Sequence, residues 1–292
     1  MRKNNKQKSF TLIELMTVVG IIAILAGLML VGYNIFFSEA NIGSSMRFDS
    51  SIHHSLGYAL VGDWKLDDNA ANSTVVDTSG NGNDGTFYSG ASEDNTANHS
   101  VDGANGRALE FDGTDDYIEA NSVSSDVTQT DLTISYWLKF ITTASKHTIS
   151  FNTVSGDNGI LLGVYDGRHQ VYTQADGRYS DTSLINNNKW HFITITLKFN
   201  TGSVSQYIDG NIEETFIITG GDISSDDLFS IGQEWDGSST SQHFPGKLDQ
   251  VRIYKEVLSI SQIKQQYYTG LQRLYKKGLI TREEYIKRVV QK

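Results

Sequence analysis

The segment at residues 77–85, rich in Asp, Asn and Gly, is the clearest candidate for metal chemistry in the sequence. Asp77, Asn81 and Asn83 are spaced by glycine and other small residues. Glycine permits a tight backbone path, so that side-chain oxygens and backbone carbonyls can converge on one point, as a hard cation such as Ca²⁺ requires. The same composition is typical of a turn whose Asp and Asn side chains bond their own backbone. The segment therefore predicts either a structural calcium loop or a self-capped turn.

Asp249 is the residue expected to close such a calcium site. By the period of two along a strand, it shares a face with Val251 and Ile253, at the margin of the core. A carboxylate placed there must be hydrogen-bonded, paired or bound to a metal. A second acidic group, residues 112–116, is better explained as a hairpin turn between two apolar segments. The predicted calcium ligands are Asp77, Asn81, Asn83 and Asp249.

Aromatic side chains are candidates for ligand binding, because sugars stack on flat aromatic faces. Trp137 is notable as an aromatic residue on the otherwise polar side of an alternating segment, and Trp235 is the second candidate. Three tyrosines join them: Tyr165, Tyr172 and Tyr179. Ordinary packing beneath a loop is the alternative for each of these residues.

The sequence lacks the patterns of common catalytic sites. It has no Cys, which excludes disulfides and thiolate zinc sites. Glycan hydrolysis needs paired carboxylates, which alternate residues of a strand would supply, but no Glu-x-Asp-x-Glu segment occurs. The seven His form neither a zinc motif nor an evident triad. We therefore expect a protein that is not an enzyme.

Charge is distributed unevenly along the chain. Residues 57–270 hold 12 Lys and Arg against 29 Asp and Glu, a net charge of −17, whereas residues 271–292 hold seven basic residues against two acidic ones. An acidic surface of this size repels nucleic acid and attracts divalent cations. Nucleic acid is therefore excluded as a partner.

The N-terminus contains a long apolar segment, Phe10 to Phe37, behind a basic start. At about 1.5 Å per helical residue this segment is long enough to cross a bilayer core of roughly 30 Å. The preceding basic residues keep that end cytoplasmic, so the rest of the chain is expected outside. A cleaved secretory signal with a cut after Ala40 is the alternative, but the segment is too long for one, and Glu14 interrupts it. A carboxylate inside a membrane indicates that a second group pairs with it there.

Residues 8–15, KSFTLIEL, resemble the leader and methylation motif of type IV pilins and pseudopilins. The resemblance implies that prepilin peptidase removes residues 1–9, cutting between Ser9 and Phe10, and methylates the new amine of Phe10. It also implies that Glu14 meets the N-terminal amine of a neighbouring pilin subunit during assembly. Ser9 replaces the usual Gly of the family, and Val31 stands where many relatives have a helix-bending Pro.

Residues 10–56 form the expected pilin-type transmembrane helix and stem. Apolar residues recur at near-helical spacing beyond Ser38, which favours an amphipathic continuation of the anchor helix. Gly43 and pairs of Ser weaken that pattern, so a flexible linker is the alternative.

Residues 57–270 show the pattern of an all-β sandwich. Residues 132–140 and 193–199 alternate apolar with polar side chains, as strands with one buried face do. Asp209, Gly210 and Asn211 tolerate positive φ and predict a tight hairpin between two further strands. Many short strands separated by turn signals favour a sandwich or jelly roll.

Four segments of this region stand out: residues 61–67 (VGDWKLD), 77–86 (DTSGNGNDGT), 109–118 (LEFDGTDDYI) and 247–254 (KLDQVRIY). In this order they resemble the laminin-G-like jelly rolls of the concanavalin A superfamily. The resemblance implies the fold, and also a calcium-binding role for residues 77–85, since several members hold Ca²⁺ with the equivalent loop. It implies less about function, because the family includes sugar binders, protein binders and structural modules.

Residues 271–292 predict a short C-terminal helical hairpin. Ser259 is suited to cap a preceding helix that ends at Gly270, and a second helix starts at Leu271. Thr281 and Glu284 then form a capping-box signature for a last helix. Its basic charge can dock on the acidic sandwich or on a neighbouring subunit, or remain solvated.

The expected function is that of a minor pilin or pseudopilin whose sandwich binds glycans or proteins in adhesion. The expected location is the membrane, with the C-terminal domain outside in a surface filament or secretion pseudopilus. The alternative is a membrane-anchored structural part of a secretion apparatus that joins no filament. A secreted glycan-cleaving enzyme is a third and weaker alternative.

Overall fold

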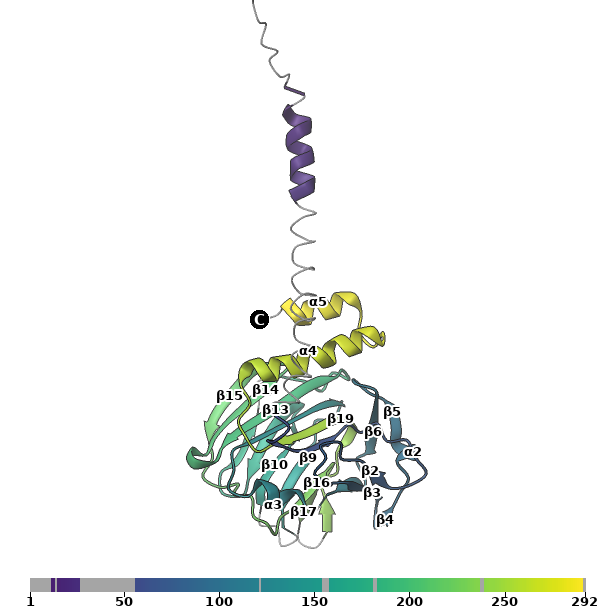
Figure 1. Cartoon of the computed structure of the whole chain (residues 1–292), viewed down its shortest axis with the longest axis vertical. Helices are drawn as coiled ribbons and strands as arrows, with labels where there is room; N and C mark the ends of the chain where they lie inside the picture. The colour runs from purple at the N-terminus through teal and green to yellow at the C-terminus, as the bar shows by residue number, and fades with distance from the viewer. Residues whose placement is uncertain are drawn as a thin grey trace, which may run out of the picture.

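The computed structural model describes residues 12–13, 15–26, 56–120, 122–153, 158–180, 183–236 and 239–290. Two large antiparallel sheets dominate the described part and pack against each other as a sandwich (Figure 1). A helical hairpin lies against the sandwich in the same view. The jelly-roll architecture predicted for the central region is therefore confirmed in outline.

The first sheet has β19 at its centre, paired on one edge to β8 and on the other to both β6 and β1. Its strands in spatial order are β15 (Asn211–Ile217), β14 (Ser203–Ile208), β13 (His191–Lys198), β8 (Leu132–Phe140), β19 (Pro245–Tyr254), β6 (Arg107–Asp112) and β5 (Ser100–Asp102), with β1 (Leu60–Trp64) beside β19.

The second sheet packs against the first, and a short ribbon leaves it after β16. Its strands in spatial order are β12 (Gly177–Ser180), β11 (Arg168–Thr173), β10 (Asn158–Tyr165), β9 (Lys146–Asn152), β16 (Leu228–Ile231), β7 (Asp116–Glu119), β3 (Gly85–Ser89) and β2 (Thr74–Val75), with β4 (Ser92–Glu93) beside β3. The ribbon consists of β17 (Glu234–Asp236) and β18 (Ser239–Ser241).

The predicted strand patterns match the structure. Alternate residues of β8, from Leu132 to Phe140, enter the core between the sheets, as the period of two requires. β14 and β15 form the predicted hairpin, in which Asp209 and Gly210 both have positive φ. Two consecutive positive φ values are the signature of the type I′ turn that matches strand twist.

Residues 112–116 differ from the predicted hairpin turn. They join β6, a strand of the first sheet, to β7, a strand of the second, and therefore carry the chain across the sandwich. Both flanking segments alternate, so the sequence pattern cannot distinguish a turn within one sheet from a crossing between two sheets.

The described helices are few and mostly short. They are α2 (Thr96–His99), α3 (Val123–Val127), the 3₁₀ turn η1 (Phe199–Thr201), α4 (Ile260–Lys276) and α5 (Arg282–Val290). Ser259 caps α4 as predicted, in a capping box with Gln262. The Thr281 hydroxyl accepts a hydrogen bond from the Glu284 amide at 3.1 Å at the start of α5. The C-terminal hairpin is therefore present, formed by α4 and α5.

The helix break predicted at Gly270 is wrong, because α4 continues through this residue to Lys276. A Cβ at position 270 would lie 2.3 Å from the Trp137 ring. Gly270 thus permits close packing of a continuous helix on the first sheet rather than ending it. The expected boundary between the sandwich and the C-terminal hairpin, at residues 270 and 271, falls inside α4. The hairpin instead begins at Ile260.

The described N-terminal residues, 12–13 and 15–26, are helical and expose their large apolar side chains, such as Leu12, Ile13 and Ile24. Among the described residues, no helix combines the length and apolar character needed to cross a bilayer. The predicted processing residues Ser9 and Phe10, the assembly residue Glu14 and the stem up to residue 55 lie outside the described residues.

Candidate functional site

The predicted calcium segment, residues 77–85, is held by a dense set of hydrogen bonds. The Oδ1 atom of Asp77 accepts bonds from the backbone amides of Asp63 and Ser79, both at 2.9 Å. Its Oδ2 atom accepts bonds from the Ser79 hydroxyl and from the Asn83 amide. Both oxygens of Asp77 therefore organise the turn.

The two predicted asparagine ligands bridge the same segment to β1. Asn81 and Asn83 donate side-chain hydrogen bonds to the Val61 carbonyl at 3.0 and 2.9 Å. The Oδ1 atom of Asn83 accepts a bond from the Ser122 hydroxyl. These bonds match the self-capped turn that the sequence left as an alternative, and calcium binding at the segment stays a prediction.

Asp249 faces the side opposite to the one predicted. It pairs with Trp137, whose ring lies outside the core between the sheets, whereas Val251 and Ile253 point into that core. The pairing register shifts between Asp249 and Arg252, and Gln250 adopts a φ of 53°. This bulge inserts one residue and reverses the alternation, so strand parity gave the wrong face.

Asp249 is buried on that outer face. Its Oδ2 atom accepts a hydrogen bond of 2.7 Å from the Asn105 amide, and its Oδ1 atom has no partner among the described residues. Burial raises the pKa of the Asp249 carboxyl well above its ordinary value. Among the described residues, the acidic side chains whose ligand atoms converge within 4.8 Å are Asp112, Asp115 and Asp116 of the crossing between the sheets.

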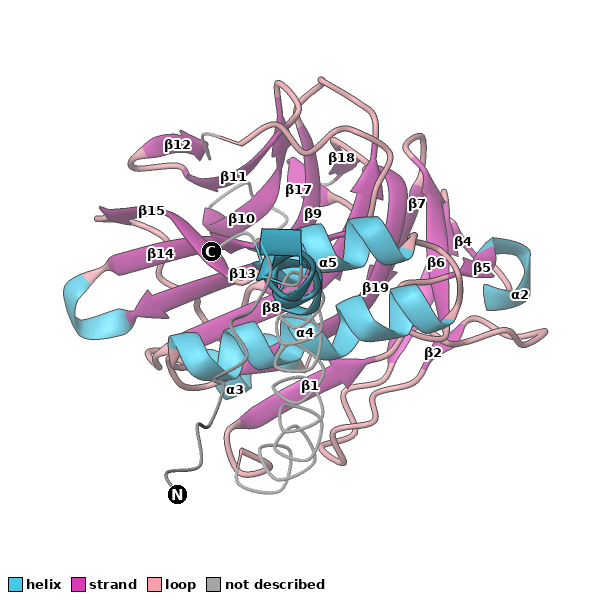
Figure 2. Cartoon of the chain, turned by 90° about the horizontal axis from the view of Figure 1, so that it is seen from above, coloured by secondary structure: helices cyan, strands magenta, loops and turns pink. Residues whose placement is uncertain are grey.

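Trp137, predicted as a stacking platform, is completely buried beneath the C-terminal hairpin. Its ring packs on Phe192 and Tyr267 with centroid distances of 5.2 and 5.9 Å, and Gly270 lies directly against it. Figure 2 shows α4 and α5 lying across this sheet, and their apolar residues form one cluster with its outer face. Trp137 therefore packs the hairpin onto the sandwich, and the prediction that it binds a ligand is wrong for this structure.

Trp235, in contrast, lines an open groove on the second sheet. The groove lies between that sheet and the ribbon of β17 and β18, with a volume of about 340 Å³. Because Val171 enters the core, the next residue, Tyr172, points to the outer face that forms one wall. The other lining residues are His147, Gln174, Arg178, Glu234, Asp236 and Gln242.

Two buried polar atoms at this groove have no hydrogen-bond partner among the described residues. They are the Trp235 indole Nε1 and the His147 Nδ1. The nearest carboxylate oxygen, Oε1 of Glu234, lies 3.6 Å from His147 Nδ1, which is too long for a hydrogen bond, and it accepts one from Gln242 instead. Both atoms are shielded from solvent, so they lie behind the wall of the groove, whose exposed polar side chains are Gln174, Arg178 and Asp236.

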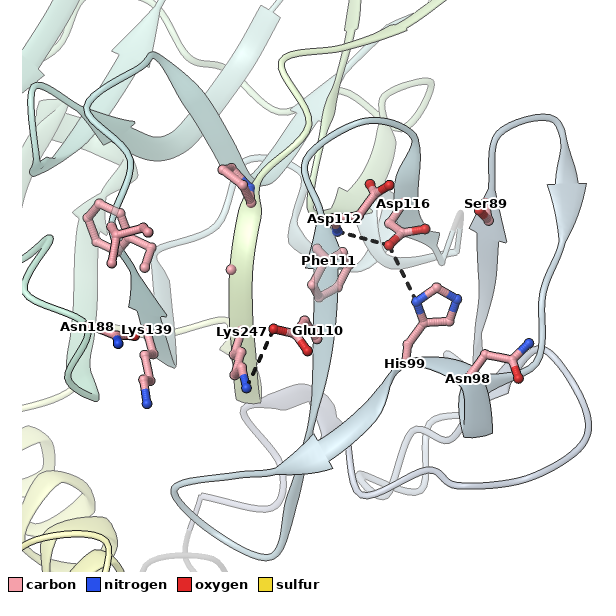
Figure 3. A pocket seen from close by; sticks show the side chains of 14 residues that line it. Ser89, Asn98, His99, Glu110, Phe111, Asp112, Asp116, Lys139, Asn188 and Lys247 are labelled. Atoms are coloured by element: carbon pink, nitrogen blue, oxygen red, sulfur yellow. Dashed lines mark hydrogen bonds and ion pairs between the residues drawn. The ribbon is translucent and has the colours of Figure 1, made fainter.

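A second and larger concavity, of about 620 Å³, lies at the edge where α2 meets β6 and β19 (Figure 3). His99 is held there between two carboxylates, with Nε2 at 2.9 Å from Asp94 and Nδ1 at 3.4 Å from Asp116. Burial raises the pKa of the Asp116 carboxyl, whereas the hydrogen bond from His99 lowers the pKa of Asp94. The ion pair of Lys247 and Glu110, at 3.5 Å, forms the opposite side.

Sequence reasoning missed most residues of both concavities. Tyr172 and Trp235 were candidates through residue type alone, whereas His147, Arg178 and His99 carried no local signal. Their positions depend on pairings between distant strands and on where the β17–β18 ribbon folds back. A single sequence does not encode such neighbours in any spacing rule.

Comparison with known proteins agrees with this architecture. Residues 112–264, just over half of the chain, match the family model described as the concanavalin A-like lectin/glucanases superfamily. Residues 4–30 match the model of the prokaryotic N-terminal methylation motif. The pilin-like start and the lectin-like sandwich predicted from the sequence are both confirmed at this level.

The similar proteins have low sequence identity to this chain, and the share of each that is covered differs widely. The sushi, von Willebrand factor type A, EGF and pentraxin domain-containing protein 1 of Rattus norvegicus is 28% identical over 141 residues, 46% of this chain and 4% of that protein. Domain 4 of AbnA, a GH43 extracellular arabinanase from Geobacillus stearothermophilus solved with arabinotriose, has a TM-score of 0.54 at 21% identity, covering 70% of this chain and 96% of that one.

A third similarity is to the binding domain of Paraclostridial Mosquitocidal Protein 1, with a TM-score of 0.52 at 17% identity, covering 73% of this chain and 52% of that one. Identities this low establish the fold alone. With its sandwich and its family match, the chain belongs to the concanavalin A-like lectin/glucanase superfamily.

Proposed function

We propose that this chain is a pilin-like surface protein, cut by prepilin peptidase between Ser9 and Phe10, whose sandwich binds a glycan outside the cell. The observation that carries the proposal is the methylation motif, whose match over residues 4–30 includes a helix with exposed apolar side chains. A helix with exposed Leu and Ile along its length needs lipid or neighbouring subunits to cover it. Both environments are available to a pilin.

In this proposal the chain is a minor pilin or pseudopilin, in a surface filament or a secretion pseudopilus. Prepilin peptidase and other pilin subunits are its protein partners. The Glu14 carboxylate, which is costly in lipid, pairs with the N-terminal amine of a neighbouring subunit during assembly.

We assign the glycan to the groove lined by Trp235 and Tyr172. The exposed polar side chains of the lining, Gln174 and Arg178, supply hydrogen-bonding groups, and the two aromatic side chains supply stacking faces. Domain 4 of AbnA, which shares the fold, was solved with arabinotriose, and this supports an oligosaccharide as the ligand class. Adhesion to a glycan-bearing surface follows as the use of the domain.

The proposed role is binding without catalysis. In the pocket of Figure 3, both ring nitrogens of His99 face carboxylates. The Ser89 hydroxyl at the same pocket donates a hydrogen bond to Asp115 at 3.3 Å rather than to His99. A nucleophile needs contact with its base, and this arrangement does not supply that contact.

Two measurements test the proposal. The mass of the full chain, coexpressed with a prepilin peptidase, is expected to match a methylated product starting at Phe10, and a product starting at Asn41 would overturn the pilin assignment. Calorimetry of the detergent-solubilised chain with arabinotriose is expected to give binding that Trp235→Ala abolishes. Tyr58→Ala, which removes an exposed aromatic ring outside the groove lining, is the matched control. Equal loss in both variants would reject the groove as the site.

A further inference from the structure

The Lys277 ammonium group, directly after α4, bonds backbone carbonyl oxygens rather than a carboxylate. Its Nζ atom donates hydrogen bonds to the Gly103 carbonyl, at 2.8 Å, and to the Gly106 carbonyl. Both glycines belong to residues 103–106, the loop that joins β5 to β6, which we call the glycine loop. The Gly103 amide closes this loop with a hydrogen bond of 3.2 Å to the Gly106 carbonyl. Two carbonyl oxygens of the loop therefore converge on one cationic group.

Two carboxylates lie directly against the glycine loop. A Cβ added at Gly103 would lie 2.5 Å from Oδ2 of Asp249, and a Cβ added at Gly106 would lie 2.1 Å from Oδ1 of Asp67. Gly106 also has a φ of 81°, which favours glycine. The two glycines thus let both acidic side chains approach the loop that binds Lys277.

Asp249 contributes an oxygen atom that no group of the described chain satisfies. The side chain is completely buried, its Oδ2 atom accepts the hydrogen bond from the Asn105 amide, and its Oδ1 atom has no partner among the described residues. Burial raises the pKa of this carboxyl, and the charge of Asp67 adds to the rise, whereas the charge of Lys277 opposes it. Asp67 and Lys277 therefore both lie within electrostatic reach of Asp249. A buried carboxylate of this kind is stabilised by a cation beside it.

The backbone beside each carboxylate has a conformation that side chains rarely adopt. Leu66, which precedes Asp67, has a φ of 55°, and Gln250, which follows Asp249, has a φ of 53°. The Gln250 amide donates a hydrogen bond of 3.4 Å to the Lys65 carbonyl, which joins the two segments. Such residues persist only where the surrounding structure fixes them, and they cluster at ligand clamps. The fold therefore holds both carboxylates at the glycine loop against local preference.

We propose that the glycine loop, Asp67 and Asp249 form a site for a divalent cation, Ca²⁺, and that the Lys277 ammonium group is a latch that occupies this site until the ion displaces it. Carbonyl and carboxylate oxygens are the ligands that Ca²⁺ prefers, and its flexible coordination accepts water at the remaining positions. Water can reach the site, because Asp67 and Lys277 are exposed. One divalent ion balances both carboxylates, whereas one ammonium group balances only one of them.

The site is separate from the other candidate sites of the molecule. It shares no residue with the segment of residues 77–85 or with the groove beside Trp235. Because Lys277 lies between α4 and α5, its release couples the ion to the C-terminal hairpin.

Calorimetric titration of the detergent-solubilised full chain with Ca²⁺ at pH 7 tests the site. The parent chain is expected to bind the ion, and Asp249→Asn is expected to lose this binding. Urea midpoints measured in chelator show whether the variant is folded, and a midpoint at or above that of the parent excludes unfolding as the reason for the loss. Absence of binding in the parent overturns the site. Binding that Asp249→Asn keeps and Asp77→Ala abolishes places the ion at residues 77–85 and overturns it as well.

Lys277→Met tests the latch, because it removes the competing charge and keeps an aliphatic side chain. This variant is expected to bind Ca²⁺ about tenfold more tightly than the parent, since no ammonium group has to be displaced or repels the ion. The matched control is Lys276→Met, the same change at the exposed preceding residue, which should leave the affinity unchanged. Equal tightening in the two variants would be a general effect of charge and would overturn the latch.

Hydrogen exchange measures the release of Lys277 directly. The Gly278 amide bonds the Tyr275 carbonyl and the Leu279 amide bonds the Leu274 carbonyl, both at 3.0 Å, in the turn that Lys277 fastens. Ca²⁺ should accelerate exchange at these two amides in the parent chain, because the turn loses its attachment to the glycine loop. In Lys277→Met the same amides should exchange fast without the ion and show no further change with it. Exchange in the parent that Ca²⁺ binding leaves unchanged overturns the displacement of Lys277.

Discussion

The two outer faces of the sandwich differ in whether helices cover them. The face of the first sheet is covered by α4 and α5, and it buries a cluster that contains Trp137, Phe192 and Tyr267. The outer face of the second sheet carries the ribbon of β17 and β18, which leaves an open groove beside Trp235. One face is therefore covered by packed helices, whereas the other leaves a groove open.

The contrast shows that strand position alone does not decide whether an aromatic side chain on an outer face is buried or lines a groove. Trp137 and Trp235 are both candidates for ligand binding by sequence. Trp137 is buried because Gly270, in a helix more than 100 positions later in the chain, packs against its ring. Because a glycine at that point lets α4 approach the ring, the first face is closed. The second face has no corresponding helix among the described residues.

The largest expected effect comes from removing each tryptophan in turn. Trp137→Ala should lower the free energy of unfolding by about 3 to 5 kcal/mol, because it leaves a cavity in a fully buried cluster. Trp235→Ala should lower it by less than about 1 kcal/mol while abolishing oligosaccharide binding. Urea denaturation measures the first quantity and calorimetry the second. Equal destabilisation by the two substitutions would contradict the division of the sandwich into a packed face and an open face.

A second prediction concerns the close contact that covers Trp137. In a freely exposed helix, Gly→Ala stabilises by about 1 kcal/mol. Gly270→Ala should instead destabilise by about 1 to 3 kcal/mol, since the new Cβ would lie 2.3 Å from the Trp137 ring. Helix propensity and the close contact predict opposite signs for the change in the free energy of unfolding, so the sign decides between them. Urea midpoints measure this change, and a red shift of tryptophan emission is expected with it. A stabilised variant would show that α4 does not need this glycine.

The sequence predicted the local and periodic features well. The β8 alternation, the Asp209–Gly210 turn and the Ser259 cap are decided by neighbouring residues, and each is present. The errors share a physical cause, which is dependence on tertiary packing. Gly270 has the local signal of a helix end but serves a contact with β8. The bulge at Gln250 moves Asp249 to the other face, and no residue pattern announced it.

Asp249, on the covered face, is expected to make the stability of the fold decrease as the pH rises. Burial raises the pKa of Asp249, so the folded state favours the protonated carboxyl. Its contribution to stability is therefore present below pH about 4 and is lost as the pH rises through the folded pKa. Asp249→Asn, which mimics the neutral form, should be more stable than the parent at pH 7 by about 1 to 3 kcal/mol and equal to it near pH 3. Urea midpoints at the two pH values measure the difference.

Asp176 provides the control with the opposite sign. Burial opposes ionisation there, but hydrogen bonds from Thr219, Gly220 and Thr173 prevail and lower the pKa of Asp176 to about 2. Its contribution is present above pH about 4 and lost as the pH falls toward 2. Asp176→Asn should therefore destabilise at pH 7 and have little effect at pH 2. If both aspartate variants change stability in the same direction at pH 7, burial of Asp249 is not the cause of its effect.

The smallest expected effect is that of Ca²⁺ at the segment of residues 77–85. A preformed ion site would stabilise the fold by about 2.7 kcal/mol at a hundredfold excess over its dissociation constant. Because both Asp77 oxygens already accept hydrogen bonds, an ion there must replace those bonds, and the net gain should be well below that value.

Melting curves of the full chain in chelator and in excess Ca²⁺ decide between an ion site and a turn. Asp77→Ala should destabilise in both conditions, because the amides of Asp63, Ser79 and Asn83 lose their acceptor. Asp84→Ala, which removes one acceptor of the Asp77 amide, is a milder control on the same segment. Equal midpoints in the parent chain identify the segment as a self-capped turn. A rise with Ca²⁺ that exceeds the rise with Mg²⁺ and disappears in Asp77→Ala identifies the ion site, since a flexible loop of Asp, Asn and carbonyl oxygens suits the larger cation.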